Sequence, residues 1–236
     1  MCSCGVGSVP VVHGETHHFA ARGLYNGGLL LGDRESSSFW QHLTGKCVYG
    51  PLKGYRREVF PLLRMTVGQA LEAYPDAQVA QSRLLFYQRA IIRAQEGVLN
   101  LLGGRLPPGF QWTMGEEDPR RPRMERGLAV WTDRVQRFYS TATLRTRGNA
   151  LIDELDGRPT LVYVDPTSGT PTCLYTDATE LSWQGDTLTL DTGESTRGGV
   201  LYDAQGATRA VDRPRQSITC WYIYAFTFPG GEIYED

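Results

Sequence analysis

The stretch Asp33-Arg-Glu-Ser-Ser-Ser-Phe-Trp40, followed closely by Thr44-Gly45, decides how this chain folds. A degenerate copy, Asp191-Thr-Gly-Glu-Ser-Thr196 followed by Gln205-Gly206, occurs in the second half. Two copies this far apart indicate two related sub-domains, because solenoids repeat at shorter periods and more than twice. We therefore predict two degenerate repeats, of which the first begins part-way through its domain.

The residues before Pro75 also match those before Pro229, and this match creates a conflict. Thr66 to Tyr74 has the pattern of a helix that ends before Pro75. Trp221 to Phe228 has the composition of a strand, since it is rich in aromatic residues. We give more weight to the repeat, because tertiary context overrides propensity in such segments, and predict a short buried helix there.

A longer helix is predicted in the middle of the chain, where apolar residues recur on one stripe. The stripe consists of Leu84, Leu85, Ile91, Ile92, Val98, Leu99 and Leu102. Ser82 is the expected N-cap, and Gly103-Gly104 the expected stop. Short strands are expected at Val9–Val12, His17–Ala21, Leu29–Leu31, Thr160–Val164, Leu181–Trp183 and Thr187–Leu190, with hairpin turns at His13-Gly14-Glu15 and Gly185-Asp186. These elements predict an α+β fold that is mainly β, with antiparallel strands, short helices and one longer central helix.

The segment Gly115 to Arg126 is a proline-broken charge run that divides the chain. Three acidic residues precede its arginines and the charges nearly cancel within the segment, so we favour a solvated connector over an anion-binding patch. We expect a first repeat over residues 1–81, N-terminally incomplete, then a central helix and charged connector over 82–126. A second repeat is expected over 127–236.

The composition of the 236 residues limits the partners of the protein. With 24 basic and 26 acidic residues the net charge is −2, which argues against a basic nucleic-acid surface. No export signal opens the chain, and the longest uncharged run, Gln216 to Gly231, is too short to span a bilayer. Five cysteines cannot all pair with one another. We therefore expect a cytoplasmic protein with reduced thiols and no membrane span.

Several residues in combination resemble those of a known family. They are Cys4-Gly5, Gly23-Leu24-Tyr25-Asn26, Asp33, Ser38, Trp40, Thr44-Gly45 and Gly50-Pro51-Leu52-Lys53-Gly54 in the first half, and Leu151 to Pro159 and Tyr224 to Pro229 in the second. Over nearly its whole length the chain resembles the bacterial and archaeal proteins grouped as domain of unknown function 3179. The resemblance implies a two-repeat, mostly β fold and no established biochemistry.

The chain departs from that family in two ways. Its members commonly have two cysteines separated by two residues before the glycine, whereas this chain has Cys2-Ser3-Cys4. The strands that usually lie upstream of that motif are missing. We expect either a native start upstream of Met1 or a variant that has lost those strands. A loss would leave unpaired strand edges near residues 1–12, through which the protein can form oligomers.

All four histidines and three of the five cysteines fall in the first 47 residues, which indicates a metal or thiol site. Cys2 and Cys4 share one face of an extended chain, so their thiolates can converge on one soft ion. His17 and His18 would point to opposite faces of a strand that returns from a turn at His13, so only one of them can join the cysteines. The candidate ligands of this zinc or copper site are Cys2, Cys4, His17, His18, His13 and Cys47.

A second candidate site is a small-molecule pocket. Polar side chains and one tryptophan from a single region of the chain favour it. Its candidate residues are Asn26, Asp33, Ser36, Ser37, Ser38, Trp40, Gln41 and Lys53. The alternative is that Asp33 and the serines stabilise turns while Trp40 fills the core.

The sequence carries no established catalytic signature. Cys4 is a weak candidate for a nucleophile, with His17 or His18 as its base, so whether the protein is an enzyme stays open. Cys173 and Cys220 are expected to be inert core thiols. Three functions follow as hypotheses: a zinc, copper or thiol site in the first repeat, a non-catalytic ligand-binding or scaffold module with structural cysteines, and a cysteine-dependent enzyme.

Overall fold

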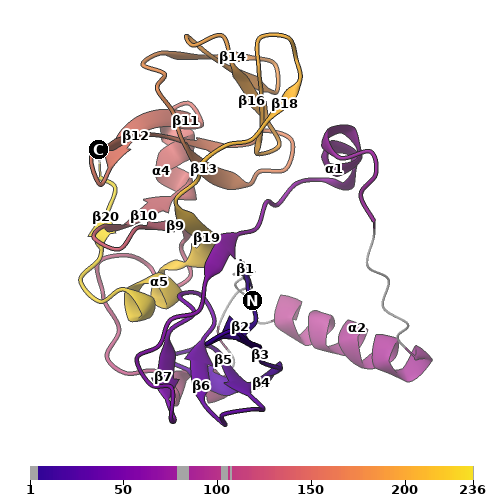
Figure 1. Ribbon diagram of the computed structural model, residues 1–236, viewed down its shortest axis with the longest axis vertical. Helices are drawn as coiled ribbons and strands as arrows, with labels where there is room; N and C mark the ends of the chain where they lie inside the picture. The colour runs from indigo at the N-terminus through magenta and orange to yellow at the C-terminus, as the bar shows by residue number, and fades with distance from the viewer. Residues whose placement is uncertain (1–4, 79–84, 102–105, 107, 236) are drawn as a thin grey trace.

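The structure is a computed structural model that describes residues 5–78, 85–101, 106 and 108–235 (Figure 1). Within these ranges the chain forms twenty strands and five helices. Almost all strand pairs are antiparallel, and only one helix exceeds two turns. The predicted α+β, mainly β class is confirmed. None of the described helices is long and apolar enough to cross a bilayer.

The first half of the chain forms a four-stranded sheet in the order β4-β5-β6-β7. Its strands are β4 (Phe19–Tyr25), β5 (Gly28–Asp33), β6 (Phe39–Gln41) and β7 (Cys47–Tyr49). Two short ladders accompany it, formed by β1 (Val6–Ser8) with β8 (Val59–Pro61) and by β2 (Val11–Val12) with β3 (Glu15–Thr16). The β2–β3 hairpin turns at His13 and Gly14, whose positive φ angles of 51° and 84° suit a two-residue hairpin turn.

His17 and His18 lie in the link between β3 and β4, and not in a strand as predicted. The reason is that the backbone N–H of His18 donates to a side-chain oxygen of Glu35 at 2.8 Å and not to a neighbouring strand. Two other predicted boundaries also differ, because Val9 and Pro10 precede the strand at Val11–Val12 and β4 starts only at Phe19.

A second four-stranded sheet, in the order β19-β9-β10-β20, forms the centre of the molecule (Figure 1). Its strands are β9 (Arg126–Trp131), β10 (Gln136–Ser140), β19 (Arg215–Cys220) and β20 (Glu232–Ile233). The helix α4 (Thr141–Thr146) follows β10, with the Ser140 hydroxyl as its N-cap. Trp131, Phe138 and Tyr139 of β9 and β10 are fully buried, so this sheet is the core around which the other elements pack.

The remaining strands form two further sheets in the second half. A three-stranded sheet contains β11 (Ala150–Leu155), β12 (Arg158–Val164) and β13 (Pro171–Tyr175). A five-stranded sheet contains β14 (Leu181–Gln184), β15 (Thr187–Leu190), β16 (Ser195–Arg197), β17 (Val200–Tyr202) and β18 (Thr208–Arg209). The strands predicted at Thr160–Val164, Leu181–Trp183 and Thr187–Leu190, and the turn at Gly185-Asp186, are all found here.

The sheets of the two halves have the same strand order. β4 to β7 follow one another as neighbours, and so do β14 to β17. Asp33 ends β5, and Asp191 directly follows β15, the strand at the same place in the second sheet. The duplication itself and the repeat boundaries at 81, 126 and 127 stay predictions.

The segment with strand-like composition is a buried helix, α5 (Trp221–Thr227), as predicted. Its first two N–H groups, of Trp221 and Tyr222, donate to the carbonyl oxygens of Glu125 and Arg123 at 2.8 and 3.1 Å. Helix N-termini leave such N–H groups without partners in the helix itself, so the charged connector satisfies them. The aromatic side chains then fill the core, with the rings of Phe138 and Trp221 5.3 Å apart.

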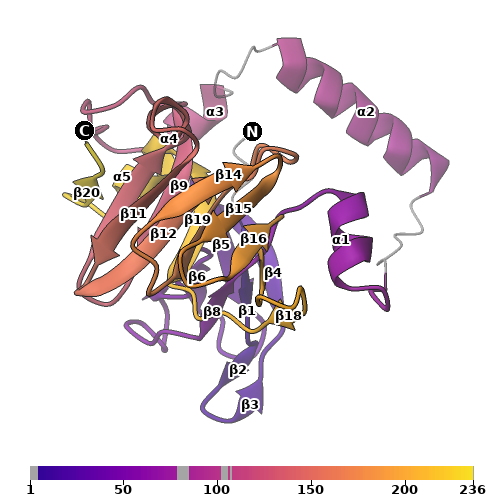
Figure 2. The same ribbon diagram turned by 90° about the horizontal axis from the view of Figure 1, so that it is seen from above.

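Of the other helices, α1 (Val67–Ala73) begins where the sequence predicts it. It starts with a capping box in which the side chains of Thr66 and Gln69 accept each other's backbone N–H groups. The central helix is α2 (Phe86–Leu101), and α3 (Pro108–Gln111) is one turn. The predicted cap Ser82 and stop Gly103-Gly104 lie outside the described residues. Figures 1 and 2 show α2 standing apart from the sheets, and Phe86 is 85% exposed.

The Gly127→Ala variant tests how closely β9 and β10 pack. A Cβ atom at Gly127 would lie 2.4 Å from the carbonyl oxygen of Tyr139 and 2.5 Å from the ring of Phe138. We expect a loss of about 1–3 kcal/mol in the free energy of unfolding, since the backbone must shift in the central sheet. Denaturant unfolding followed by circular dichroism measures it. The matched control is Gly109→Ala in α3, where a Cβ meets nothing within 4 Å and stability should not fall.

Candidate functional site

The carboxylate of Asp33, at the end of β5, is buried and held by three donors. The backbone N–H of Ser36 donates at 2.6 Å, its hydroxyl at 2.7–2.8 Å, and the indole N–H of Trp40 at 2.6 Å. Burial alone would raise the pKa of Asp33, but the hydrogen bonds from Ser36 and Trp40 outweigh it and lower the pKa. The hydroxyl of Ser38 joins the network by accepting from Ser36 at 2.8 Å. Asp33, Ser38 and Trp40 thus form an internal network.

His17 lies against this network with an unsatisfied ring nitrogen. Its Nδ1 atom is 3.5 Å from Asp33 Oδ1 and 4.0 Å from Glu35 Oε2. The side chain is 8% exposed, and Nδ1 is buried without a hydrogen-bond partner. Ligating atoms of His17, Asp33 and Glu35 all lie within 4.8 Å of one another, and no other group of this kind occurs among the residues that the structure describes.

Glu35 connects the two neighbouring histidines. It accepts the backbone N–H of His18 at 2.8 Å, and the His18 Nδ1 atom lies 2.7 Å from Glu35 Oε1. These two hydrogen bonds from His18 lower the pKa of Glu35 to about 2. The His18 side chain is 77% exposed, whereas that of His17 is buried, and both rings lie beside Glu35.

The other histidines lie elsewhere. The ring of His13 packs against Tyr55 with centroids 4.8 Å apart, and His42 Nδ1 is 3.0 Å from the carbonyl oxygen of Leu29. Cys2 and Cys4 lie outside the described residues. Gly5 exchanges hydrogen bonds of 3.2 Å with the hydroxyl of Ser217 on β19.

The three described cysteines are buried thiols. Burial raises the pKa of Cys47, whose Sγ donates to the carbonyl oxygen of Tyr49 at 3.3 Å. Burial also raises the pKa of Cys173, which packs in the core between β9 and β12. Cys220 is 1% exposed in the cluster around α5. Since their pKa values are raised, Cys47 and Cys173 are neutral thiols at neutral pH, and all three cysteines pack in the interior.

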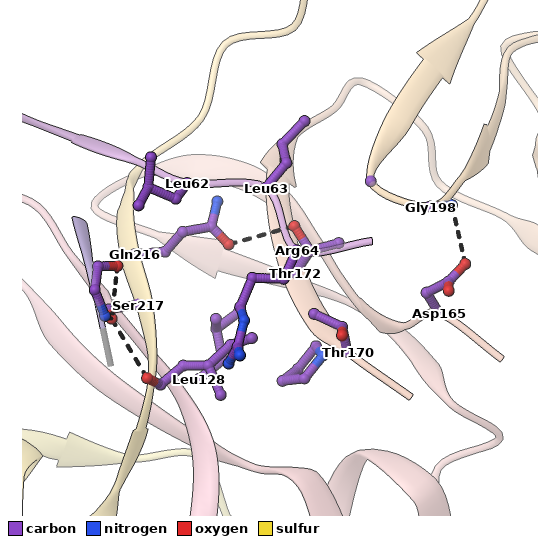
Figure 3. Close-up of a pocket in the computed structure, with 14 residues that line it drawn as sticks. Leu62, Leu63, Arg64, Leu128, Asp165, Thr170, Thr172, Gly198, Gln216 and Ser217 are labelled. Atoms are coloured by element: carbon purple, nitrogen blue, oxygen red, sulfur yellow. Dashed lines mark hydrogen bonds between the residues drawn. The ribbon is translucent and has the colours of Figure 1, made fainter. Parts of the chain in front are cut away.

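A cavity near the start of the chain is too small for an organic ligand. It has a volume of about 20 Å³, and Asp165, Thr172, Gln216 and Ser217 are among the residues around it (Figure 3). That space suffices for one water molecule. A larger cavity of about 660 Å³ beside α4 is lined by hydroxyls and exposed arginines without an aromatic ring.

A further cavity, of about 460 Å³, lies where β6 and β7 meet β9, β10 and α5, and we call it the β6–α5 cavity. It contains two of the predicted pocket residues, Asn26 and Gln41. Asp33, Ser38 and Trp40 do not line it, and Lys53 lies in the exposed turn that follows β7. The structure therefore divides the predicted pocket residues between this cavity, the Asp33 network and a surface turn.

The residues that sequence reasoning missed are Glu35 at the histidines and Trp131, Lys46, Arg56 and Asp133 at the cavity. Glu35 had one usable signal, because a hairpin between β4 and β5 pairs Phe19 with Asp33 and brings the residues beyond them together. A bulge between Ala21 and Gly23 shifts that register by one residue, and no sequence rule locates the bulge.

This fold and site define a mainly β protein of the α+β class with a buried histidine next to two carboxylates. A family model described as protein of unknown function DUF3179 matches residues 1–229, so the chain belongs to this family. No curated protein and no solved structure matched the chain.

Thiol labelling tests the assignment of the buried cysteines. Because thiolates are the reactive form, we expect Cys47, Cys173 and Cys220 of the folded protein to stay unmodified by a disulfide reagent at neutral pH. Mass spectrometry of tryptic peptides locates the labels, and unfolded protein is the control in which all thiols react. Rapid labelling of Cys47 or Cys173 in folded protein would contradict their burial.

The pH dependence of stability tests the Glu35 contact. Its folded pKa of about 2 lies below the ordinary 4.5, so ionised Glu35 stabilises the fold fully above about pH 5, and this contribution is lost as the pH falls through about 2. The gap in unfolding free energy between wild type and Glu35→Gln should therefore shrink as the pH is lowered. Urea unfolding between about pH 2.5 and 5.5 measures it. A gap that stays constant would show that His18 does not stabilise the carboxylate.

Proposed function

We propose that this protein binds one divalent metal ion, preferably zinc, through His17, Asp33 and Glu35. The observation that carries the proposal is the buried, unpartnered Nδ1 atom of His17, which faces two carboxylates. A buried nitrogen without a partner costs about 1–3 kcal/mol, so a cation bound between these groups would offset a deficit of the fold.

The separations of the donor atoms support a tetrahedral ion. Bonds of about 2.0–2.2 Å put two ligands of a tetrahedral zinc about 3.3–3.6 Å apart. His17 Nδ1 and Asp33 Oδ1, at 3.5 Å, already have this separation. Glu35 Oε2, at 4.0 Å from His17 Nδ1, would have to move closer by less than 1 Å while His18 keeps its hold on the carboxylate. Three protein ligands leave a fourth position for water or a ligand.

The surroundings of the carboxylates also favour a bound ion. A carboxylate has about four acceptor sites, and the donors to Asp33 occupy three of them, so one stays for a metal. His18 holds Glu35 by two contacts. Such hydrogen bonds from the outer residues fix the orientation of metal ligands.

The donor set favours zinc over copper. Imidazole and carboxylate are ordinary zinc ligands, whereas monovalent copper selects thiolates. Cys47, Cys173 and Cys220 lie outside the group around His17. The alternative is a binding or scaffold module without a metal, in which His17 is an electrostatic partner of Asp33, and the two hypotheses differ in the metal content they predict.

Metal analysis of the purified full-length chain tests the proposal. After chelator treatment and dialysis against zinc chloride, we expect one zinc per chain. His17→Asn and Glu35→Gln should each weaken binding by about tenfold or more, since each removes a ligand. Equilibrium dialysis with mass-spectrometric detection measures the affinity, and circular dichroism checks that each variant folds.

Two control variants distinguish the proposed histidine and carboxylate ligands from the other candidate metal ligands. His13→Asn changes a histidine that packs on Tyr55 and should leave zinc binding unchanged. A variant with Cys2 and Cys4 replaced by serine removes the thiols that the sequence suggests as metal ligands. If zinc stays bound in His17→Asn and Glu35→Gln but is lost in the serine variant, the thiols are the metal ligands. If no folded sample contains stoichiometric zinc, the metal-free module is supported.

A further inference from the structure

The rim of the β6–α5 cavity has more positive than negative charge. Lys46 and Arg56 both line it and face each other in an isolated antiparallel bridge. Like charges at opposite positions repel each other. Asp133, the one carboxylate that lines the cavity, is 3.4 Å from Arg56 and is also bonded by Arg215 at 2.6 Å. Asp133 is already bonded by Arg56 and Arg215 and cannot also balance Lys46, which favours an anion at this rim.

The inner wall of the cavity is aromatic. Trp131, Phe226 and Phe228 line it, and the rings of Trp131 and Phe228 are 5.4 Å apart. The indole N–H of Trp131 is buried and has no hydrogen-bond partner in the described part of the chain. An apolar ring of a ligand would be removed from water on this wall, which favours its binding.

The side-chain amide of Gln41 lines the cavity and has a fixed orientation. Gln41 of β6 donates to the hydroxyl of Thr227 on α5 at 2.8 Å, and its carbonyl oxygen accepts from both the N–H and the hydroxyl of Thr44. These contacts fix the Gln41 side chain, and its second N–H makes no other bond to the described residues. The cavity therefore has one oriented donor next to its charged rim.

We propose that the β6–α5 cavity binds a small organic carboxylate that carries an aromatic or other apolar ring. Lys46 and Arg56 would pair with the carboxylate. The ring would lie on Phe226 and Phe228, the partly exposed aromatic side chains of the wall, in front of the buried Trp131. The volume of about 460 Å³ lies within the range of about 300–1,000 Å³ that is usual for small-molecule sites. The cavity shares no residue with His17, Asp33 and Glu35, so this proposal is independent of the metal site.

Benzoate and its uncharged analogue benzamide test the proposal on the full-length protein in the presence of a metal chelator. The indole N–H resonance of Trp131, assigned by its loss in Trp131→Phe, reports binding in a titration at constant ionic strength. We expect benzoate to shift this resonance in a saturable way and benzamide to bind about tenfold more weakly, because it lacks the charge. Lys46→Gln should weaken benzoate binding by a similar factor.

Lys53→Gln is the matched control, since Lys53 lies in a surface turn and does not line the cavity. It should leave the affinity for benzoate unchanged. The proposal is overturned if benzoate does not move the Trp131 resonance up to its solubility limit, if benzamide binds as well as benzoate, or if Lys46→Gln and Lys53→Gln have equal effects. Spectra of each variant show whether it is folded.

Discussion

The buried carboxylate of Asp33 is the constraint on which the first half of the structure depends. A buried charge is stable only when hydrogen bonds replace water, and Ser36 and Trp40 supply them. The same bonds fix the turn after β5, bring the Trp40 ring into the core and place Glu35 beside His18. The position of the candidate metal site therefore follows from the hydrogen bonds that stabilise the buried carboxylate of Asp33.

The short strand β6 connects this network to the β6–α5 cavity. Successive side chains of a strand point to opposite faces. Trp40 accordingly reaches Asp33, while the adjacent Gln41 reaches Thr227 on α5 and lines the cavity. The three residues of β6 thus contribute side chains to one candidate site on each face of the same sheet. The two candidate sites share no side chain, because the two faces of the strand carry different residues.

The connector and α5 hold the two halves of the chain together. The charge run from Gly115 to Arg126 is partly ordered by its own ion pairs, such as Arg123 with Glu117, and its carbonyl oxygens accept the first N–H groups of α5. The aromatic residues of α5 then pack on β9 and β10 and form one wall of the cavity. A segment expected to be a solvated connector therefore has a structural role at a helix terminus.

The sequence by itself determined the features that depend on neighbouring residues: the capping box of α1, the turns at His13-Gly14 and Gly185-Asp186, and the mainly β class. The repeat further predicted the helix α5, against its strand-like composition. Only the tertiary structure decided the bulge in β4, which brings Glu35 to His17 and His18, and the meeting of Lys46, Arg56 and Asp133 at one rim. The reason is physical, since turns and caps are set by contacts within a few residues, whereas register shifts and cavity walls depend on packing between segments far apart in the chain.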